Sequence, residues 1–247
     1  MDYRETYVPY EGGQLWSCES GLNEHKTILL CNGGPGCSDY LSPVADMLEH
    51  YRVIRFEQRG CGRSTADGRY DLATTLEDIH HLKQYYHLSQ FIIGGHSWGA
   101  NLALVYALTH PESVEALIYI AGSGIHDNRH WSEQYHKNLE SKGETYPEFP
   151  YPFNPEVNDM GNRTLREFGR DPHLYSRIRD LDIPAIFLMA KNDIRPSWPS
   201  QQIANLMSKA DYVTLGDSAH YMWLDKADAM KNILNDFLEQ LGVFDDC

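Results

Sequence analysis

A serine flanked by glycines could act as a nucleophile in this chain. It lies in the segment Gly95-His96-Ser97-Trp98-Gly99, which has the spacing G-x-S-x-G. In a nucleophile elbow of this kind a strand turns sharply into a helix, and the turn exposes the serine hydroxyl above the edge of the sheet. The alternative is an ordinary strand–helix turn that contains a serine. An apolar run before the motif and an Ala/Leu-rich stretch after it favour the elbow.

The rest of the chain offers a base and an acid for this serine. A serine hydroxyl is a poor nucleophile unless a base takes its proton, and the base in turn needs an acid that orients it. Asp193 and His220 follow the apolar runs at 184–190 and 212–215, in the order serine, acid, histidine that such elbows use. We therefore predict the triad Ser97, Asp193 and His220. Asp217, three residues before His220, is the rival acid.

The chain has twelve histidines, so the alternatives to His220 must be considered. His126 and His130 have the i,i+4 spacing of a zinc pair, but the glutamate of an H-E-x-x-H motif is missing. His96 precedes the nucleophile in the chain and is expected to support the turn. We expect no metal and no organic cofactor, because triad chemistry needs neither.

Acyl transfer also needs N–H groups that face the oxygen on which negative charge develops. One donor is expected to be the main-chain N–H of Trp98, directly after the nucleophile. The other is expected from Gly34, in the glycine-rich loop at 32–36 that follows the apolar run at 27–31. Glycines allow the backbone to come close to a substrate, although a simple Gly-Pro turn is the alternative for this loop.

Short apolar runs alternate with amphipathic stretches along the chain. Strands are predicted at 27–31, 51–56, 91–94, 114–120, 184–190 and 212–215, and helices at 74–87, 98–109, 199–208 and 225–241. This alternation predicts an α/β fold with a mainly parallel, twisted sheet flanked by helices. A polar, aromatic and proline-rich stretch interrupts the pattern. We predict a core at 1–123 and 182–247, and an insertion at 124–181 that forms a short helical cap over the sheet.

The composition limits the classes of binding partner and the cellular compartment that we expect. Lys plus Arg total 21 and Asp plus Glu total 35, so the net charge is 21 − 35 = −14. This charge argues against non-specific binding to nucleic acid or to an anionic membrane. No apolar run reaches the length of a membrane span, and the first residues are polar, unlike a secretion signal. The five cysteines, Cys247 among them, lack CxxC spacing. They indicate free thiols and a cytoplasmic location.

Three segments together resemble the α/β-hydrolase superfamily and, within it, the prolyl iminopeptidase group. That group carries an HGGPG-type oxyanion loop, a DQRGCGRS-type segment beside the catalytic cleft and a GGxSxG elbow. The corresponding segments here are Asn32–Gly36, Glu57–Ser64 and Gly94–Gly99. Asn32 stands where the group has histidine, and Glu57 where it has aspartate. The resemblance maps the triad onto Ser97, Asp193 and His220.

The resemblance implies a serine hydrolase that releases an N-terminal residue from small peptides. Members hold the substrate amine with carboxylates, partly from the cap, and in some an acidic residue follows the catalytic aspartate, where this chain has Ile194. The cap candidates are Glu133, Glu140, Glu144, Glu148 and Glu156, each of which could equally be a solvated surface charge. An esterase, a lactonase, a carbon–carbon bond hydrolase or a non-catalytic ligand receptor are the alternatives.

The cap aromatics could line a pocket or form a small core of the cap. They are Trp131, Tyr135, Tyr146, Phe149, Tyr151 and Phe153. The sequence leaves both readings open, along with the oligomeric state.

Overall fold

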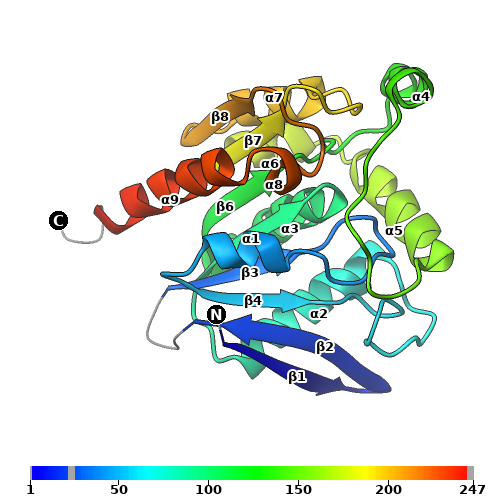
Figure 1. Cartoon of the computed structure of the whole chain (residues 1–247). Coiled ribbons are helices and arrows are strands. Elements are labelled where there is room, and N and C mark those ends of the chain that lie inside the picture. The colour runs from blue at the N-terminus through cyan, green and yellow to red at the C-terminus, as the bar shows by residue number, and fades with distance from the viewer. Residues whose placement is uncertain (1, 22–25, 244–247) are drawn as a thin grey trace.

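The computed structural model describes residues 2–21 and 26–243. In this part of the chain eight strands form one sheet, in the order β1-β2-β4-β3-β5-β6-β7-β8 (Figure 1). The strands are β1 (Tyr3–Tyr10), β2 (Gly13–Ser20), β3 (Thr27–Cys31), β4 (Arg52–Phe56), β5 (Phe91–His96), β6 (Val114–Ile120), β7 (Ala185–Ala190) and β8 (Ala210–Leu215). The helices are α1 (Ser42–Met47), α2 (Leu72–Tyr85), α3 (Trp98–Thr109), α4 (Arg129–Lys142), α5 (Pro155–Phe168), α6 (Leu174–Arg179), α7 (Trp198–Leu206), α8 (Met222–Asp225) and α9 (Ala227–Val243).

The predicted α/β fold is confirmed. Strands β3 to β8 run parallel, whereas β1 and β2 pair antiparallel with each other and β2 pairs antiparallel with β4. Every run predicted as a strand lies in this sheet, and the predicted helix at 225–241 corresponds to α9, apart from its first residues at the end of α8. The hairpin of β1 and β2 was not predicted. Its outer strand is mostly exposed and polar, so it has no continuous apolar run.

The sheet separates two apolar layers, because successive strand residues point to opposite faces. Ile93, Leu117 and Phe187 pack in one cluster with α2, α3, α6 and α7. Their neighbours Ile92, Ile118 and Leu188 pack in the other with α1, α8 and α9. Burial on both faces explains why these strands are continuously apolar.

The order of the strands reverses between β3 and β5. The chain passes from β3 outward to β4, and then returns across β3 to β5 on its other side. Open parallel sheets bind ligands at such a reversal, beyond the carboxyl ends of the strands. The predicted oxyanion loop follows β3 and the elbow follows β5, so the two segments lie at the carboxyl ends of the strands where the order reverses.

Helices α4, α5 and α6 connect β6 to β7 (Figure 1). No residue of α4 is buried. Helix α5 packs against the glycine-rich loop, where a Cβ on Gly161 would lie 2.7 Å from Pro35 Cγ. Leu174 and Ile178 of α6 pack into the core cluster on the α3 side of the sheet. The connection therefore covers the carboxyl ends of the strands with its first two helices and rejoins the core with the third.

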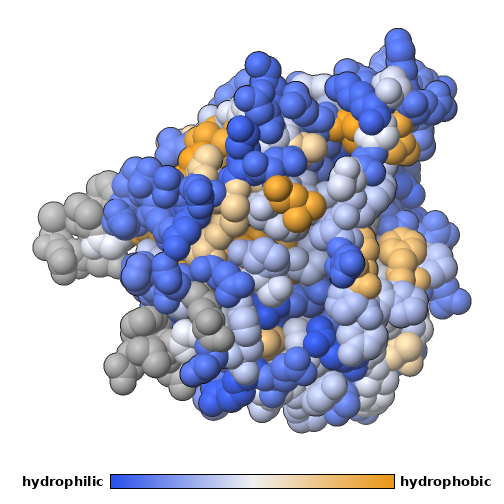
Figure 2. Space-filling view, in the orientation of Figure 1, coloured by the Kyte–Doolittle hydropathy of each residue, from blue (hydrophilic) through white to orange (hydrophobic). Residues whose placement is uncertain are grey.

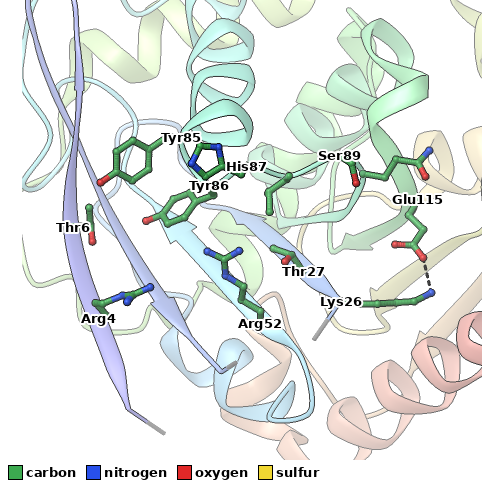
Figure 3. Close-up of a pocket in the computed structure, with 12 residues that line it drawn as sticks. Arg4, Thr6, Lys26, Thr27, Arg52, Tyr85, Tyr86, His87, Ser89 and Glu115 are labelled. Carbon is green, nitrogen blue, oxygen red and sulfur yellow. Dashed lines mark hydrogen bonds and ion pairs between the residues drawn. The ribbon is translucent and has the colours of Figure 1, made fainter. Parts of the chain in front are cut away.

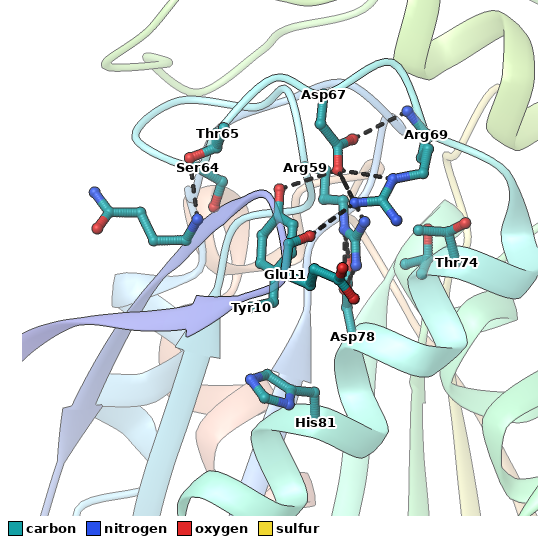
Figure 4. Close-up of polar contacts among 12 residues, drawn as sticks. Tyr10, Glu11, Arg59, Ser64, Thr65, Asp67, Arg69, Thr74, Asp78 and His81 are labelled. Atoms are coloured by element: carbon teal, nitrogen blue, oxygen red, sulfur yellow. Dashed lines mark hydrogen bonds and ion pairs between the residues drawn. The ribbon is translucent and has the colours of Figure 1, made fainter.

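Arg59 fastens the edge hairpin to α2 (Figure 4). Its guanidinium donates to Asp78 of α2 at 2.6 Å and to Asp67 at 2.9 Å, and lies 4.0 Å from the ring centre of Tyr10, at the end of β1. Burial raises the pKa of Asp78 to about 6 despite this ion pair. Arg59 belongs to the segment Glu57–Ser64, which thus joins β1 to α2.

The face of the molecule in Figure 2 is mostly hydrophilic, and apolar side chains show there only in small separate groups. Among the described helices none combines the length and the apolar character that a membrane span requires. Cys18, Cys31, Cys37 and Cys61 are free thiols, whereas Cys247 lies outside the described residues.

Replacement of Gly99 should destabilise the fold. A Cβ at Gly99 would lie 2.1 Å from the carbonyl oxygen of Cys31, so helix α3 would have to move away from β3. We expect Gly99→Ala to lower the free energy of unfolding by about 2 kcal/mol or more, as overpacking of a tight core does. Gly242→Ala in α9 is the matched control, because nothing lies within 4 Å of its Cβ position. Equal urea midpoints for the two variants would contradict this account of the elbow.

Candidate active site

The turn between β5 and α3 has the backbone of a nucleophile elbow. Ser97 has φ of 59° and ψ of −123°, in a region that side chains other than glycine rarely adopt. Its N–H donates to the carbonyl oxygen of Ile120 at 2.8 Å, which ties the turn to β6. A Cβ on Gly95 would lie 2.2 Å from the carbonyl oxygen of Gly99, so only glycine allows this close approach of strand and helix.

His220 and Asp193 meet at the carboxyl ends of β8 and β7. The Nδ1 atom of His220 lies 2.6 Å from Oδ2 of Asp193, and both side chains are almost fully buried. No hydrogen bond among the described residues joins the rival acid Asp217 to His220. The arrangement leaves Nε2 of His220 for a proton from another group, which is what a base requires.

An uncharged chain of hydrogen bonds runs through His96. Its Nε2 lies 3.0 Å from the carbonyl oxygen of His220, and its Nδ1 lies 2.8 Å from the hydroxyl of Tyr40. A carbonyl oxygen only accepts, so Nε2 carries the proton and Nδ1 accepts from Tyr40. The Tyr40 oxygen in turn accepts from the N–H of Gly33 at 2.9 Å. Burial, with His220 alongside, lowers the pKa of His96 well below its usual value, which agrees with this neutral form.

The glycine-rich loop packs directly on the elbow. A Cβ on Gly33 would lie 2.9 Å from Cβ of Ser97. In the described part of the chain, no hydrogen bond uses the N–H of Gly34 or of Trp98, whereas Gly33 donates to Tyr40. Both predicted oxyanion donors therefore have an N–H group without a partner among the described residues.

Helix α5 holds the same loop from the other side. The side-chain amide of Asn158 donates to the carbonyl oxygens of Gly34, at 3.0 Å, and Pro35, at 2.8 Å. One turn earlier, the N–H of Asn154 donates to the carbonyl oxygen of Gly36 at 2.9 Å. These bonds hold the carbonyl groups of Gly34, Pro35 and Gly36, in the part of the loop that directly follows the N–H expected as the donor.

The two departures from the resembling family have structural roles in this chain. Asn32 donates from Nδ2 to the carbonyl oxygen of Phe56 at 2.7 Å, and its Oδ1 accepts from the N–H of Tyr40. Glu57 is fully buried and accepts from the N–H of Asp39 at 2.9 Å and from the guanidinium of Arg63 at 2.8 Å. Both side chains thus fasten the loop after β3 to the segment after β4.

The charged groups around His220 and Asp193 determine the protonation states of these two side chains. Burial lowers the pKa of His220, and the Arg195 guanidinium lowers it further against the opposing effect of Asp193. Burial would raise the pKa of Asp193, but His220 and Arg195 outweigh it and bring the pKa to about 2. The imidazole is therefore neutral and the carboxylate ionised at neutral pH, which is the state in which a base can accept a proton.

Of the five candidate cap carboxylates, only Glu144 lies beside the triad. Its oxygen, an oxygen of Asp193 and a ring nitrogen of His220 lie within 4.8 Å of one another. The other four, Glu133, Glu140, Glu148 and Glu156, are exposed. Both oxygens of Glu144 pair with the guanidinium of Arg195, which also donates to Asp193 at 3.2 Å. A cavity of about 500 Å³ opens between Glu144, Ile194 and His220.

Neither metal site suggested by ligand spacing is available to an ion. The carboxylates of Glu144 and Asp193 already share the guanidinium of Arg195. His126 uses both ring nitrogens, one near the carbonyl oxygen of Ser123 and one that accepts from the N–H of Asn128. The side chain of His130 is 93% exposed and lies beside Glu133. The structure thus gives the predicted zinc alternative no support.

The cap aromatics divide into separate groups and form no common core. Trp131 and Tyr135 stack on each other along α4, with ring centres 5.5 Å apart. Phe149 packs edge-on against Tyr40, at 5.4 Å. The remaining three are exposed: Tyr146, Tyr151 and Phe153.

A comparison with models of protein families identifies the family to which this chain belongs. The model of the alpha/beta hydrolase fold matches residues 26–167, more than half of the chain. This chain belongs to the α/β-hydrolase family. The match includes the glycine-rich loop, the segment Glu57–Ser64 and the elbow.

Related α/β hydrolases include curated proline iminopeptidases. One from Xylella fastidiosa is 36% identical over 141 residues, which cover 52% of this chain and 44% of that protein. One from Lactobacillus delbrueckii subsp. lactis is 22% identical over 292 positions, covering 96% of this chain and 99% of that protein. In the first relative this chain thus matches less than half of the protein's length.

Solved α/β hydrolases share the fold over nearly the whole chain. A proline iminopeptidase from Mycobacterium smegmatis superposes with a TM-score of 0.73 at 17% identity, covering 97% of this chain and 99% of that one. A structure from work on carboxylesterases of Nitrososphaera gargenis gives 0.78 at 17% identity, with the same coverage. At these identities the likeness concerns the fold.

A second hollow of this α/β hydrolase lies at the opposite end of the sheet (Figure 3). It has a volume of about 1000 Å³ and is lined by Thr27 and Arg52, the first residues of β3 and β4. Its charged groups pair with each other or with neighbours: Lys26 with Glu115, and Arg52 with Glu19. Ligands of such sheets bind at the carboxyl ends of the strands, where Ser97 lies, so this hollow is not the candidate site.

Sequence reasoning did not single out Tyr40, Asn158 or Arg195 at this α/β-hydrolase site. Tyr40 and Asn158 act on residues far away in the sequence, and no local motif marks them. Arg195 lies two residues after the predicted acid, so a search for charges next to Asp193 could have found it.

Removal of the Asn158 amide should weaken catalysis. Asn158→Ala frees the carbonyl of Gly34, and we expect kcat for ester hydrolysis to fall about tenfold, because small misplacements of reacting groups are costly. Asn162→Ala is the matched control, since the Asn162 amide donates to the carbonyl oxygen of Asn158 in the same helix. Steady-state kinetics of both variants checks this expectation. An equal kcat for the two would show that α5 does not fix the loop.

Proposed function

We propose that this α/β hydrolase is a serine hydrolase that works through an acyl-enzyme intermediate. The observation that carries the proposal is the 2.6 Å contact of His220 Nδ1 with Asp193. The ring of His220 lies 4.4 Å from that of His96, the residue directly before the strained elbow serine. Ser97 would be the nucleophile, His220 the base, Asp193 the orienting acid, and Gly34 and Trp98 the oxyanion donors. No metal or organic cofactor enters this chemistry.

The proposed reaction has two halves. Ser97 Oγ attacks the substrate carbonyl while His220 Nε2 takes the hydroxyl proton, and the negative oxygen accepts from Gly34 and Trp98. His220 then gives the proton to the leaving group, and the acyl group remains on Ser97. Water, activated by the same imidazole, releases the acid and restores the serine.

Within this chemistry we propose release of an N-terminal residue from small peptides. The support is twofold: the proline iminopeptidase names of the relatives, and the place of Glu144 beside the triad. Residues 124–181 would act as the cap over the carboxyl ends of the strands, with Glu144 attracting the substrate ammonium.

A carboxylesterase is the second candidate, and one observation favours it. Glu144 is already paired with Arg195, so an incoming ammonium would have to share this carboxylate. The other cap carboxylates are exposed and Ile194 is apolar. An ester or thioester needs no such partner.

A reducing, cytoplasmic compartment fits this proposal. The four cysteines that the structure describes are free thiols, one of which, Cys37, is partly exposed beside the glycine-rich loop. Small-molecule or short-peptide substrates are the partners that we propose.

Two substrates measured side by side test the proposed function. We expect wild-type protein to release p-nitroaniline from L-proline p-nitroanilide or p-nitrophenol from p-nitrophenyl butyrate, and Ser97→Ala to lose at least about 10³-fold in kcat because the nucleophile is gone. A fluorophosphonate probe should label wild type and not Ser97→Ala.

The pattern of turnover separates the candidates. Prolyl turnover that depends on Ser97 supports the aminopeptidase, whereas ester cleavage alone supports the esterase. Labelling of Ser97 without turnover of either substrate would point to a different acyl group, such as a lactone. A protein that is neither labelled nor active would be a ligand receptor, and the proposal would be wrong.

A further inference from the structure

The two carboxylate oxygens of Asp193 are held from different directions. Oδ2 faces Nδ1 of His220 at 2.6 Å. Oδ1 accepts from the main-chain N–H of Arg195 at 2.9 Å and from Nη1 of the same arginine at 3.2 Å. The carboxylate is 3% exposed, so water does not replace these donors. Arg195 thus fixes the plane in which Asp193 meets the imidazole.

The other side of the guanidinium is held by the insertion. Nη1 and Nη2 of Arg195 donate to the two oxygens of Glu144, in the segment between α4 and α5. Glu144 is 4% exposed and Arg195 16% exposed, so this forked ion pair is largely shielded from solvent. The ring of Tyr135 lies 5.5 Å from the guanidinium and covers it.

Uncharged bonds bring the same loop against α4. The side-chain amide of Asn138 donates to the carbonyl oxygen of Ile194, and the indole of Trp131 donates to that of Pro196, both at 2.8 Å. The loop would therefore stay near α4 without Arg195. What Arg195 adds is charge between two carboxylates.

That charge, together with His220, keeps the pKa of Asp193 low. Glu144 and Asp193 lie within 4.8 Å of each other, and like charges at this distance in a buried site raise each other's tendency to bind a proton. Arg195 is the cation between them. Without it, Asp193 would lose the Nη1 donor to Oδ1, and the unopposed negative charge of the two carboxylates would raise the pKa of His220.

We infer that Arg195 is a positioning residue for the acid of the triad, and that Glu144 of the insertion anchors it. The inference rests on the proposed function, in which Asp193 orients His220. It makes the insertion part of the catalytic machinery, because one of its side chains sets the electrostatics of the triad through Arg195.

The pH dependence of catalysis reports this arrangement. The titratable and charged groups around His220 are Asp193, Arg195, Glu144, His96 and Tyr221. His96 stays neutral at working pH, because its pKa is well below the usual value. Arg195 lowers the pKa of His220 and Glu144 raises it, so the two must act in opposite directions.

The test uses p-nitrophenyl butyrate, because an ester does not need Glu144 for an amine. In Arg195→Met we expect the acidic limb of the pH profile of kcat/KM to shift to higher pH by about 1 unit. We expect kcat to fall at least tenfold with little change in KM. In Glu144→Gln the limb should move down, and Arg195→Lys should lie between Arg195→Met and wild type. Asn138→Ala, which loosens the same loop without a change of charge, should leave the limb in place.

A spectroscopic readout keeps the test independent of turnover and of one variant. The Nδ1 proton of His220 should give a downfield proton NMR signal, assigned by its loss in His220→Ala. It should persist in Glu144→Gln and shift or broaden in Arg195→Lys. The inference alone would be overturned if the acidic limbs of Arg195→Met and Glu144→Gln moved in the same direction. An unchanged His220 signal in Arg195→Lys and Arg195→Met would also overturn it. Loss of all Ser97-dependent turnover in wild type would overturn the proposed function and the inference with it.

Discussion

The backbone of Ser97 is the constraint on which the site depends. A left-handed residue other than glycine is costly, and it persists only where the surroundings over-determine it. Here the N–H bond to Ile120, the close approach of Gly95 to Gly99 and the contact of Gly33 with the serine all enforce the same turn. Because the turn is fixed, the hydroxyl emerges above the sheet, and α3 begins with an N–H that has no partner among residues 2–21 and 26–243.

Around this turn the site is assembled mainly by neutral hydrogen bonds. The chain from Gly33 through Tyr40 and His96 to His220 joins the loops after β3, β5 and β8 without a buried charge. A buried ion would need a compensating partner at each step, whereas a fully satisfied neutral network does not. Charge is confined to the side of Asp193, where Arg195 and Glu144 balance it.

The central strands and the elbow could be predicted because their signals are local. The runs at 27–31 and 114–120 are buried on both faces, so their composition alone indicates strands, and their bounds agree with β3 and β6. The β1–β2 hairpin could not be predicted, because its outer strand is largely exposed and carries Pro9. The acid and base were predicted from strand ends and chain order, and the structure brings them within hydrogen-bond distance.

The residues of the insertion that contact the candidate site could not be predicted in the same way. Asn158 meets Gly34 across more than 120 residues, and nothing in either neighbourhood indicates the contact. Glu144 was one of five equivalent carboxylates in the sequence, and only the course of the chain after α4 distinguishes it. Long-range polar contacts follow from tertiary packing, which local composition does not encode.

The insertion is attached to the core largely by hydrogen bonds to main-chain carbonyl oxygens of the core. Side-chain amides of Asn138, Asn154 and Asn158 donate to carbonyl groups of Ile194, Gly60 and Gly34. Every residue type supplies a carbonyl oxygen, so substitutions in the core loops leave these attachment points intact. In evolutionary terms the attachment is modular: a cap of another length could be grafted onto this core if it supplied amide donors at the same places.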